Sequence, residues 1–284
     1  MSISAEVNDL FQNKGMAHGP GGVRSEWVLL TPELAEEFLA HNIDNRHVRK
    51  VHVTRLAHDM TKGHFAVTHQ GIAFDDEGIM RDGQHRCLGV IASGVPVPVL
   101  VTYNLPATSQ RFMDRGATRK VSDFMDGPHA AVRASAVRNL LAVRIAEGEL
   151  TPGRLDAAFR AVTDGDVYDL LESSPGLVED LMDLVPASRR ASNQVPIGPS
   201  PLLAAAVLYP YIGETVLDGL ATGENLEPGS PILAFRNYRL RIPPGGQSLP
   251  LYTACRVFAA VQSDTKLRKF PVVGVSGVVK VAPR

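Results

Sequence analysis

The chain has 284 residues, of which 44% are hydrophobic and 21% are charged, and its formal net charge is −1. This composition supports a folded core and excludes both a wholly disordered chain and a globally basic nucleic-acid-binding protein. No apolar run is long enough to span a membrane, and residues 1–24 hold no apolar signal-peptide core, so we expect a cytoplasmic protein with no membrane partner.

In chain order, residues 1–25 form a glycine-rich leader that we expect to be flexible. The apolar run 27–30 follows, and then Thr31 and Pro32 predict the start of a helix that ends near Ala40. The apolar spacing from Val48 to Met60 predicts a second helix that stops at Gly63. The opposite face of this helix is basic and consists of Arg46, Arg49, Lys50, His52, Arg55 and Lys62. This face is either simply solvated or adds positive charge beside a ligand.

Short strands and a helix come next. Residues 71–74 and 79–81 flank a hairpin turn at 75–78, and a helix ends at Gly94. The β-branched run 95–101 predicts a strand, and its prolines indicate a sheet edge or a strand start. We therefore predict an α+β unit over residues 26–126.

The stretch between the hairpin and the helix, residues 81–87 (RDGQHRC), is the strongest candidate site. Asp82 is predicted to cap the helix, and Gly83 allows close backbone approach to a ligand. The amides of residues 83–86 would face outward, and His85 and Arg86 would add side-chain donors to a phosphate-binding turn. The alternative is an ordinary Asp-Gly turn followed by a solvated arginine.

The second half of the chain carries helical patterns and no catalytic motif. The basic loop 112–120 is either a plain surface loop or a second anion-contacting loop built on Arg115 and Arg119. We expect an all-helical domain over 127–265 and a basic, partly disordered tail over 266–284. The two cysteines, Cys87 and Cys255, form no CxxC pair, which favours reduced, buried thiols over a disulfide or a zinc site.

Residues 42–103 resemble the ParB/sulfiredoxin-like superfamily. Asn45-Arg46 followed by the 56–63 helix end resembles the first ParB box, and 71–74, 83–86 and 97–99 resemble the second. The Asp-Gly-Gln-His-Arg form is similar to the phage-type variant named "ParB-like nuclease". The resemblance implies a ParB/sulfiredoxin-like N-terminal domain, a phage or mobile-element origin and, if phage-encoded, a location in the host cytoplasm.

The resemblance also implies site residues, and the pattern of the basic loop adds Arg115 and Arg119 to them. The set expected around a nucleoside triphosphate, ATP or CTP, is Asn45, Arg46, Gly83, Gln84, His85, Arg86, Arg115 and Arg119. Asp82 and His85 would be catalytic, and Asp82 would hold Mg²⁺ or orient an acceptor hydroxyl. Gln84 stands where sulfiredoxin has a cysteine, so sulfinic-acid reduction is not expected. His85-Arg86 replaces the double arginine of the partition family, so CTP selectivity does not carry over.

Three functions follow from these residues. The preferred one is a Mg²⁺-dependent NTPase or phosphotransferase in DNA or nucleotide metabolism. The second is a DNA nuclease, if the carboxylates Asp75, Asp76, Glu77, Asp82 and Asp114 converge. The third is a non-catalytic DNA-binding or regulatory protein with nucleotide as its ligand. The oligomeric state is left open by the sequence, a homodimer being one option.

Overall fold

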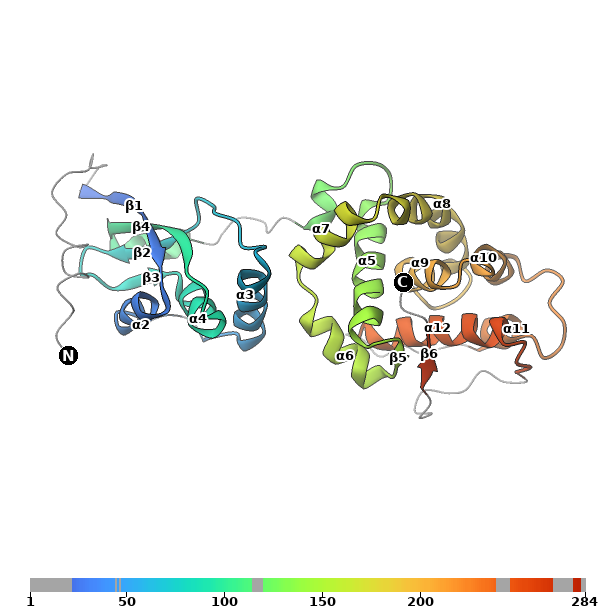
Figure 1. Cartoon of the computed structure of the whole chain (residues 1–284). Helices are drawn as coiled ribbons and strands as arrows, with labels where there is room; N and C mark the ends of the chain where they lie inside the picture. The colour runs from blue at the N-terminus through green and yellow to red at the C-terminus, as the bar shows by residue number, and fades with distance from the viewer. Residues whose placement is uncertain are drawn as a thin grey trace. The chain divides into compact units, whose positions relative to one another are not determined.

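The computed structural model describes residues 22–43, 45, 47–113, 120–238, 246–267 and 278–281. The chain divides into two compact units, Met1–Thr118 and Arg119–Arg284, and each is described by itself (Figure 1). The expected division lay after residue 126. A short 3-10 helix, η3 (Val121–Phe124), packs against α5 (Ala130–Ile145) and so belongs with the second unit.

The N-terminal unit is α+β. Its sheet has the order β1-β4-β2-β3, with β1 antiparallel to β4, β2 parallel to β4, and β2 antiparallel to β3. Figure 1 shows α2 and α4 together on one side of this sheet, and α3 packs against α4. The elements in order are β1 (Arg24–Leu30), α2 (Pro32–Ala40), α3 (Lys50–Lys62), β2 (Ile72–Asp75), β3 (Met80–Asp82), α4 (Gln84–Ser93), β4 (Val97–Leu105) and the 3-10 helix η2 (Ala107–Phe112).

The start of α2 and the C-terminal ends of α3 and α4 are where the sequence predicts them. Thr31 caps α2 by accepting a hydrogen bond from the Leu34 amide at 3.2 Å. Gly63 and Gly94 end α3 and α4 in the left-handed conformation, with φ of 76° and 67°. The expected leader is two residues too long, because β1 already begins at Arg24.

Of the two positions that the prolines of residues 95–101 allow, a sheet edge and a strand start, the structure shows the strand start. β4 is an inner strand, with β1 on one side and β2 on the other. Pro98 lies opposite Leu29 of β1, whereas the pairing with β2 begins only at Val101. The proline therefore occupies the start of the strand, where one side has no neighbour that needs its missing N–H.

The second unit is mostly helical. Its other helices are α6 (Pro152–Ala161), α7 (Asp164–Ser173), α8 (Pro175–Ser192), α9 (Pro199–Leu208), α10 (Gly213–Thr222), α11 (Pro231–Asn237) and α12 (Ser248–Gln262). The core gathers around α9, whose residues 202–208 are all buried.

The expectation of an all-helical second half with a separate tail is also wrong. The short strand β5 (Glu149–Leu150) pairs antiparallel with β6 (Val279–Lys280). Val279 and Val281 are buried in the core of this unit, so the described end of the chain is part of its fold. Among the helices of the described residues, none is long and apolar enough to cross a membrane.

Candidate functional site

The turn from β3 into α4 has the expected strand–glycine–helix geometry, with one correction. Gly83, not Asp82, is the N-cap residue, and its φ is 109°. The Asp82 carboxylate instead accepts from the Gly83 amide, from Gly83 N to Asp82 Oδ1 at 2.7 Å. A Cβ on residue 83 would lie 2.7 Å from Ile72 Cγ1. Glycine is thus required here both for its φ and for packing against β2.

The amides of the turn do not all face outward as expected. The Gly83 amide donates to Asp82, and the Arg86 amide donates to the Gly83 carbonyl at 2.9 Å. The Cys87 amide donates to the same carbonyl at 3.1 Å. A continuous anion nest over residues 83–86 is therefore absent from the described turn.

His85 points into the protein. Its side chain is buried, and its Nε2 accepts from the Arg49 amide at 3.1 Å. Because Nε2 is the acceptor, the neutral ring carries its proton on Nδ1. The ring also meets His52 edge to face, with 5.1 Å between centroids. The predicted contact of His85 with phosphate is not formed in this arrangement, and the histidine instead holds the start of α3 against α4.

The segment 42–49 is fastened to the same turn by amide side chains. Gln84 is buried, and its Oε1 accepts from Asn42 Nδ2 at 3.3 Å. Asn45 Nδ2 donates to Asn42 Oδ1 at 2.5 Å and to the Met80 carbonyl at 2.8 Å. The structure thus brings Asn45, Gln84 and His85 together. Arg46 lies outside the described residues.

Asp82 and Arg86 form the accessible edge of the turn. Their side chains are 31% and 20% exposed, and Arg86 NH1 lies 3.9 Å from Asp82 Oδ2. Arg86 NH1 also donates to the Gly71 carbonyl at 2.6 Å. This bond fixes the guanidinium beside β2 while the side chain remains within reach of solvent.

The carboxylates do not converge as a nuclease needs. Asp75 is buried, and its Oδ1 accepts from the amides of Glu77 and Ile79 at 3.0 and 2.8 Å. Its Oδ2 accepts from Arg81 Nε at 2.6 Å, so this residue holds the hairpin together. Asp114 lies outside the described residues, and within those residues there is no group of three or more metal-binding side chains. Asp82 is thus the accessible acidic candidate within the turn.

Cys87 follows the turn and is buried. Desolvation raises the pKa of its thiol to about 12, so it stays protonated near neutral pH. A nucleophilic role for this thiol therefore has no support.

Sequence reasoning missed the residues that support the site. Asn42, the Arg49 backbone and the Asp75–Arg81 pair bind the turn to its neighbours, but nothing in their spacing marked them. The one available signal was an Asp at the first position of a hairpin turn, where its side chain often accepts from the following amides. Arg115 and Arg119 lie outside the described residues.

The exposed side of α3 is basic, as its pattern predicts. Lys50, His52 and Lys62 are exposed, and Arg49 is exposed just before the helix. This surface adjoins the candidate site, because the Arg49 amide is bonded to His85.

No family model matches this sequence, and comparison with curated proteins and with solved structures gives no match either. The ParB/sulfiredoxin-like resemblance of residues 42–103 therefore stays a prediction.

Proposed function

We propose that the N-terminal unit is a ParB/sulfiredoxin-like domain that binds a nucleoside triphosphate, ATP or CTP, with Mg²⁺ at the β3–α4 turn. In this proposal the protein is an NTP hydrolase or phosphotransferase in DNA or nucleotide metabolism. The observation that carries it is the attachment of segment 42–49 to the turn through Asn42, Asn45 and the Arg49 amide. The two stretches that resemble separate ParB boxes thereby share one surface.

The accessible edge supports the chemistry. A guanidinium suits phosphate because it is always charged and presents a planar fork of donors, which is the role proposed for Arg86. Asp82, 3.9 Å away, offers a carboxylate to the Mg²⁺ that arrives with the nucleotide or to an acceptor hydroxyl. His85 becomes a positioning residue, since its Nε2 holds the Arg49 amide.

A thermal-shift panel of ATP, CTP, GTP and UTP, with and without Mg²⁺, tests the proposal. A ligand that binds only the folded state raises the melting temperature. We expect one nucleotide to raise it in the presence of Mg²⁺ and to be turned over to a phosphorylated product or free phosphate. Arg86→Ala should lose the shift, whereas Arg190→Ala, an exposed arginine of α8, should keep it. No shift with any nucleotide would contradict the proposal.

The basic side of α3 favours a second candidate, a non-catalytic nucleic-acid-binding protein. Such binding depends on phosphate contacts and falls steeply as salt rises. Replacing Lys50 and Lys62 by alanine should then weaken DNA binding and flatten its salt dependence. Salt-independent or undetectable binding of duplex DNA would remove this candidate. No observation favours the nuclease, because the Asp75 carboxylate already accepts hydrogen bonds from Arg81 and from two hairpin amides.

A further inference from the structure

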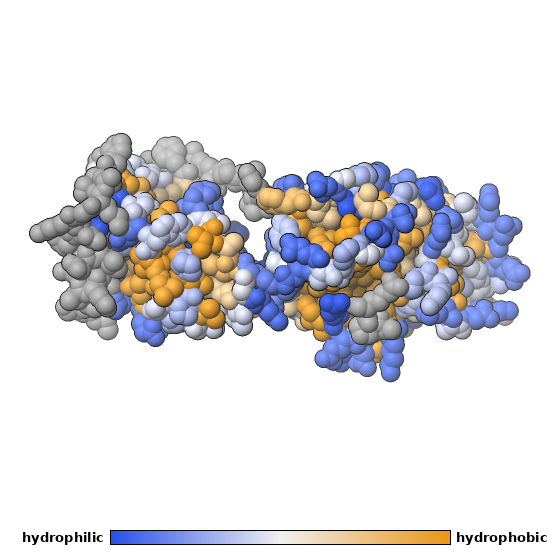
Figure 2. Space-filling model, turned by 45° about the horizontal axis from the view of Figure 1, so that its top comes forward, coloured by the Kyte–Doolittle hydropathy of each residue, from blue (hydrophilic) through white to orange (hydrophobic). Residues whose placement is uncertain are grey.

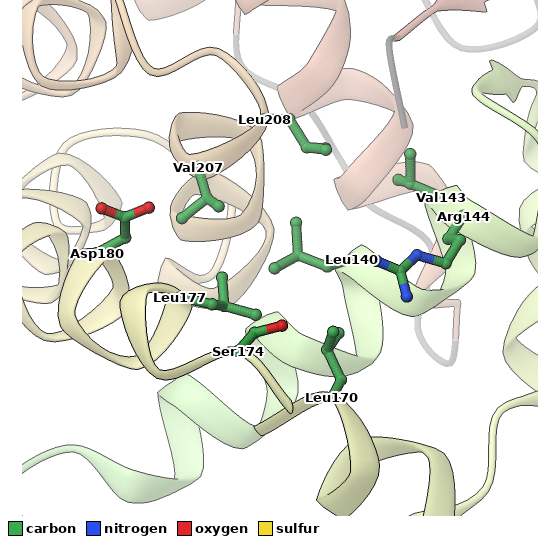
Figure 3. A pocket seen from close by; sticks show the side chains of 9 residues that line it. All are labelled: Leu140, Val143, Arg144, Leu170, Ser174, Leu177, Asp180, Val207 and Leu208. Carbon is green, nitrogen blue, oxygen red and sulfur yellow. The ribbon is translucent and has the colours of Figure 1, made fainter. Parts of the chain in front are cut away.

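The second unit contains a cavity of about 150 Å³ between α5, α7, α8 and α9 (Figure 3). Its wall is apolar: Leu140, Val143, Leu170, Leu177, Val207 and Leu208 line it. All of these except Leu177 are buried, so the wall is part of the packed core. An apolar cavity of about this size holds one benzene-sized group.

Two hydrogen-bond donors lie at the rim of this cavity. Figure 3 shows the Arg144 guanidinium and the Ser174 hydroxyl on opposite sides of Leu140, both directed toward the space between them. Ser174 is the N-cap residue of α8, yet its side chain makes no capping hydrogen bond. Its hydroxyl therefore faces the cavity rather than the first turn of the helix.

We propose that this cavity binds a small carboxylic acid whose tail is one aromatic ring or a short branched chain. The tail would fill the apolar space, and the carboxylate would accept from Arg144 and Ser174. Asp180 also lines the cavity, and Figure 3 places it on the far side of Val207 from Arg144. With one cation and one anion at the rim, a singly charged carboxylate fits better than a doubly charged phosphate. This site is separate from the proposed nucleotide function and does not depend on it.

Calorimetric titration of the full-length protein tests this assignment with four probes. Phenylacetate and 3-methylbutanoate carry the proposed groups, benzyl alcohol lacks the charge, and phenylphosphonate carries up to two charges. We expect at least one of the two carboxylates to bind saturably. Benzyl alcohol, which lacks the charge, and phenylphosphonate, which carries up to two charges, should bind at least about tenfold more weakly. Equal binding of benzyl alcohol, or no saturable binding of either carboxylate, would overturn the proposal.

Variants locate the binding. Arg144→Met keeps an apolar stem and should weaken carboxylate binding about tenfold or more, with little effect on benzyl alcohol. Leu177→Trp fills the half-buried side of the cavity and should abolish binding of all probes. Arg190→Met, on the exposed side of α8, is the control and should bind as the parent chain does. Thermal melts establish that each variant is folded. Unchanged carboxylate affinity in folded Arg144→Met would also overturn the assignment.

Discussion

The two units use buried polar side chains in different ways. In the N-terminal unit, three side chains at the candidate turn join segments far apart in sequence: Gln84 to Asn42, His85 to Arg49, and Asn45 to Met80. In the second unit, three buried polar side chains donate to backbone carbonyls three to five residues away: Arg133 to Pro128, Ser188 to Val185, and Thr253 to Leu249. Local bonds of the second kind stay within one helix or the turn before it, whereas the first kind fixes the tertiary position of a loop.

Both units expose some hydrophobic surface (Figure 2). Figure 2 shows hydrophobic surface on the N-terminal unit, and Trp27 and Leu29 of its β1 are 60% and 59% exposed. The second unit buries residues 202–208 of α9 completely within its helices. The polar bonds at the candidate site are thus long-range, whereas the core of the second unit is built around the buried apolar residues of α9. Four predictions test this contrast, beginning with the largest effect.

The two apolar cores should be equally sensitive to truncation. Phe74 is fully buried beside Phe38 and Tyr103, and Phe258 is fully buried beside Tyr209. Phe74→Ala and Phe258→Ala should each cost about 3–5 kcal/mol. Trp27, the single tryptophan, reports on the N-terminal unit by fluorescence, and circular dichroism at the helix band reports mainly on the second. Because the cores are separate clusters, each loss should fall on the unit that carries the substitution. Equal shifts of both signals would contradict the comparison.

Breaking the Asp75–Arg81 ion pair should lower the free energy of unfolding almost as much as truncating a core phenylalanine. Asp75→Ala leaves the Arg81 guanidinium, only 13% exposed, without its carboxylate, and it removes the acceptor for two hairpin amides. Breaking such a pair from one side should cost about 3 kcal/mol in denaturant unfolding followed by Trp27 fluorescence. Asp76→Ala, at the exposed neighbouring position, is the control and should stay within about 0.5 kcal/mol.

Gly83 should tolerate alanine less well than another left-handed glycine of the same unit. Gly78 has a φ of 74° and open space around its missing Cβ, whereas Gly83 has a φ of 109° and Ile72 at 2.7 Å. Gly78→Ala should cost about 1 kcal/mol for its backbone conformation, and Gly83→Ala about 2–3 kcal/mol because packing adds to it. Equal losses would show that the packing against Ile72 is unimportant.

The smallest expected effect comes from removing single polar side chains, one that bonds over a long sequence distance and one that bonds locally. Asn45→Ala removes neutral hydrogen bonds, and Thr163→Ala removes the acceptor of the Asp166 amide together with a hydrogen bond to the Asp166 carboxylate. Each should cost about 1 kcal/mol. Amide hydrogen exchange should distinguish them. Asn45→Ala should lower protection at residues 80–85 as well as 42–49, whereas Thr163→Ala should affect only the first turn of α7. Effects confined to residues 44–46 in the first variant would contradict the long-range role.

Local signals predicted much of the fold. Thr31, Gly63 and Gly94 marked helix ends because capping chemistry is local, and the glycine of the 75–78 turn marked the hairpin. Pro98 left both a sheet edge and a strand start open, because a proline reports only its own missing donor and not where the neighbouring strand begins. Strand β6 was missed since two residues carry no period and their pairing with Glu149 and Leu150 is a long-range event.

The candidate site was predicted only in outline. The sequence located the turn and its glycine, but it could not show that His85 and Gln84 point inward, because their partners Arg49 and Asn42 lie 36 and 42 residues away. The buried role of Asp75 was missed although its partners lie only two to six residues away, because its pairing with Arg81 depends on the hairpin closing. Side-chain direction at a turn is decided by tertiary contacts rather than by local pattern.

The most direct test of the account is a nucleotide titration of isotope-labelled protein followed by amide chemical shifts. With Mg²⁺ and the nucleotide selected by the thermal-shift panel, we expect saturable shifts concentrated in residues 82–86 and 42–49, lost in Arg86→Ala. Saturating nucleotide that leaves both segments unperturbed, or that shifts only amides of the helical unit, would contradict a phosphate site at the β3–α4 turn.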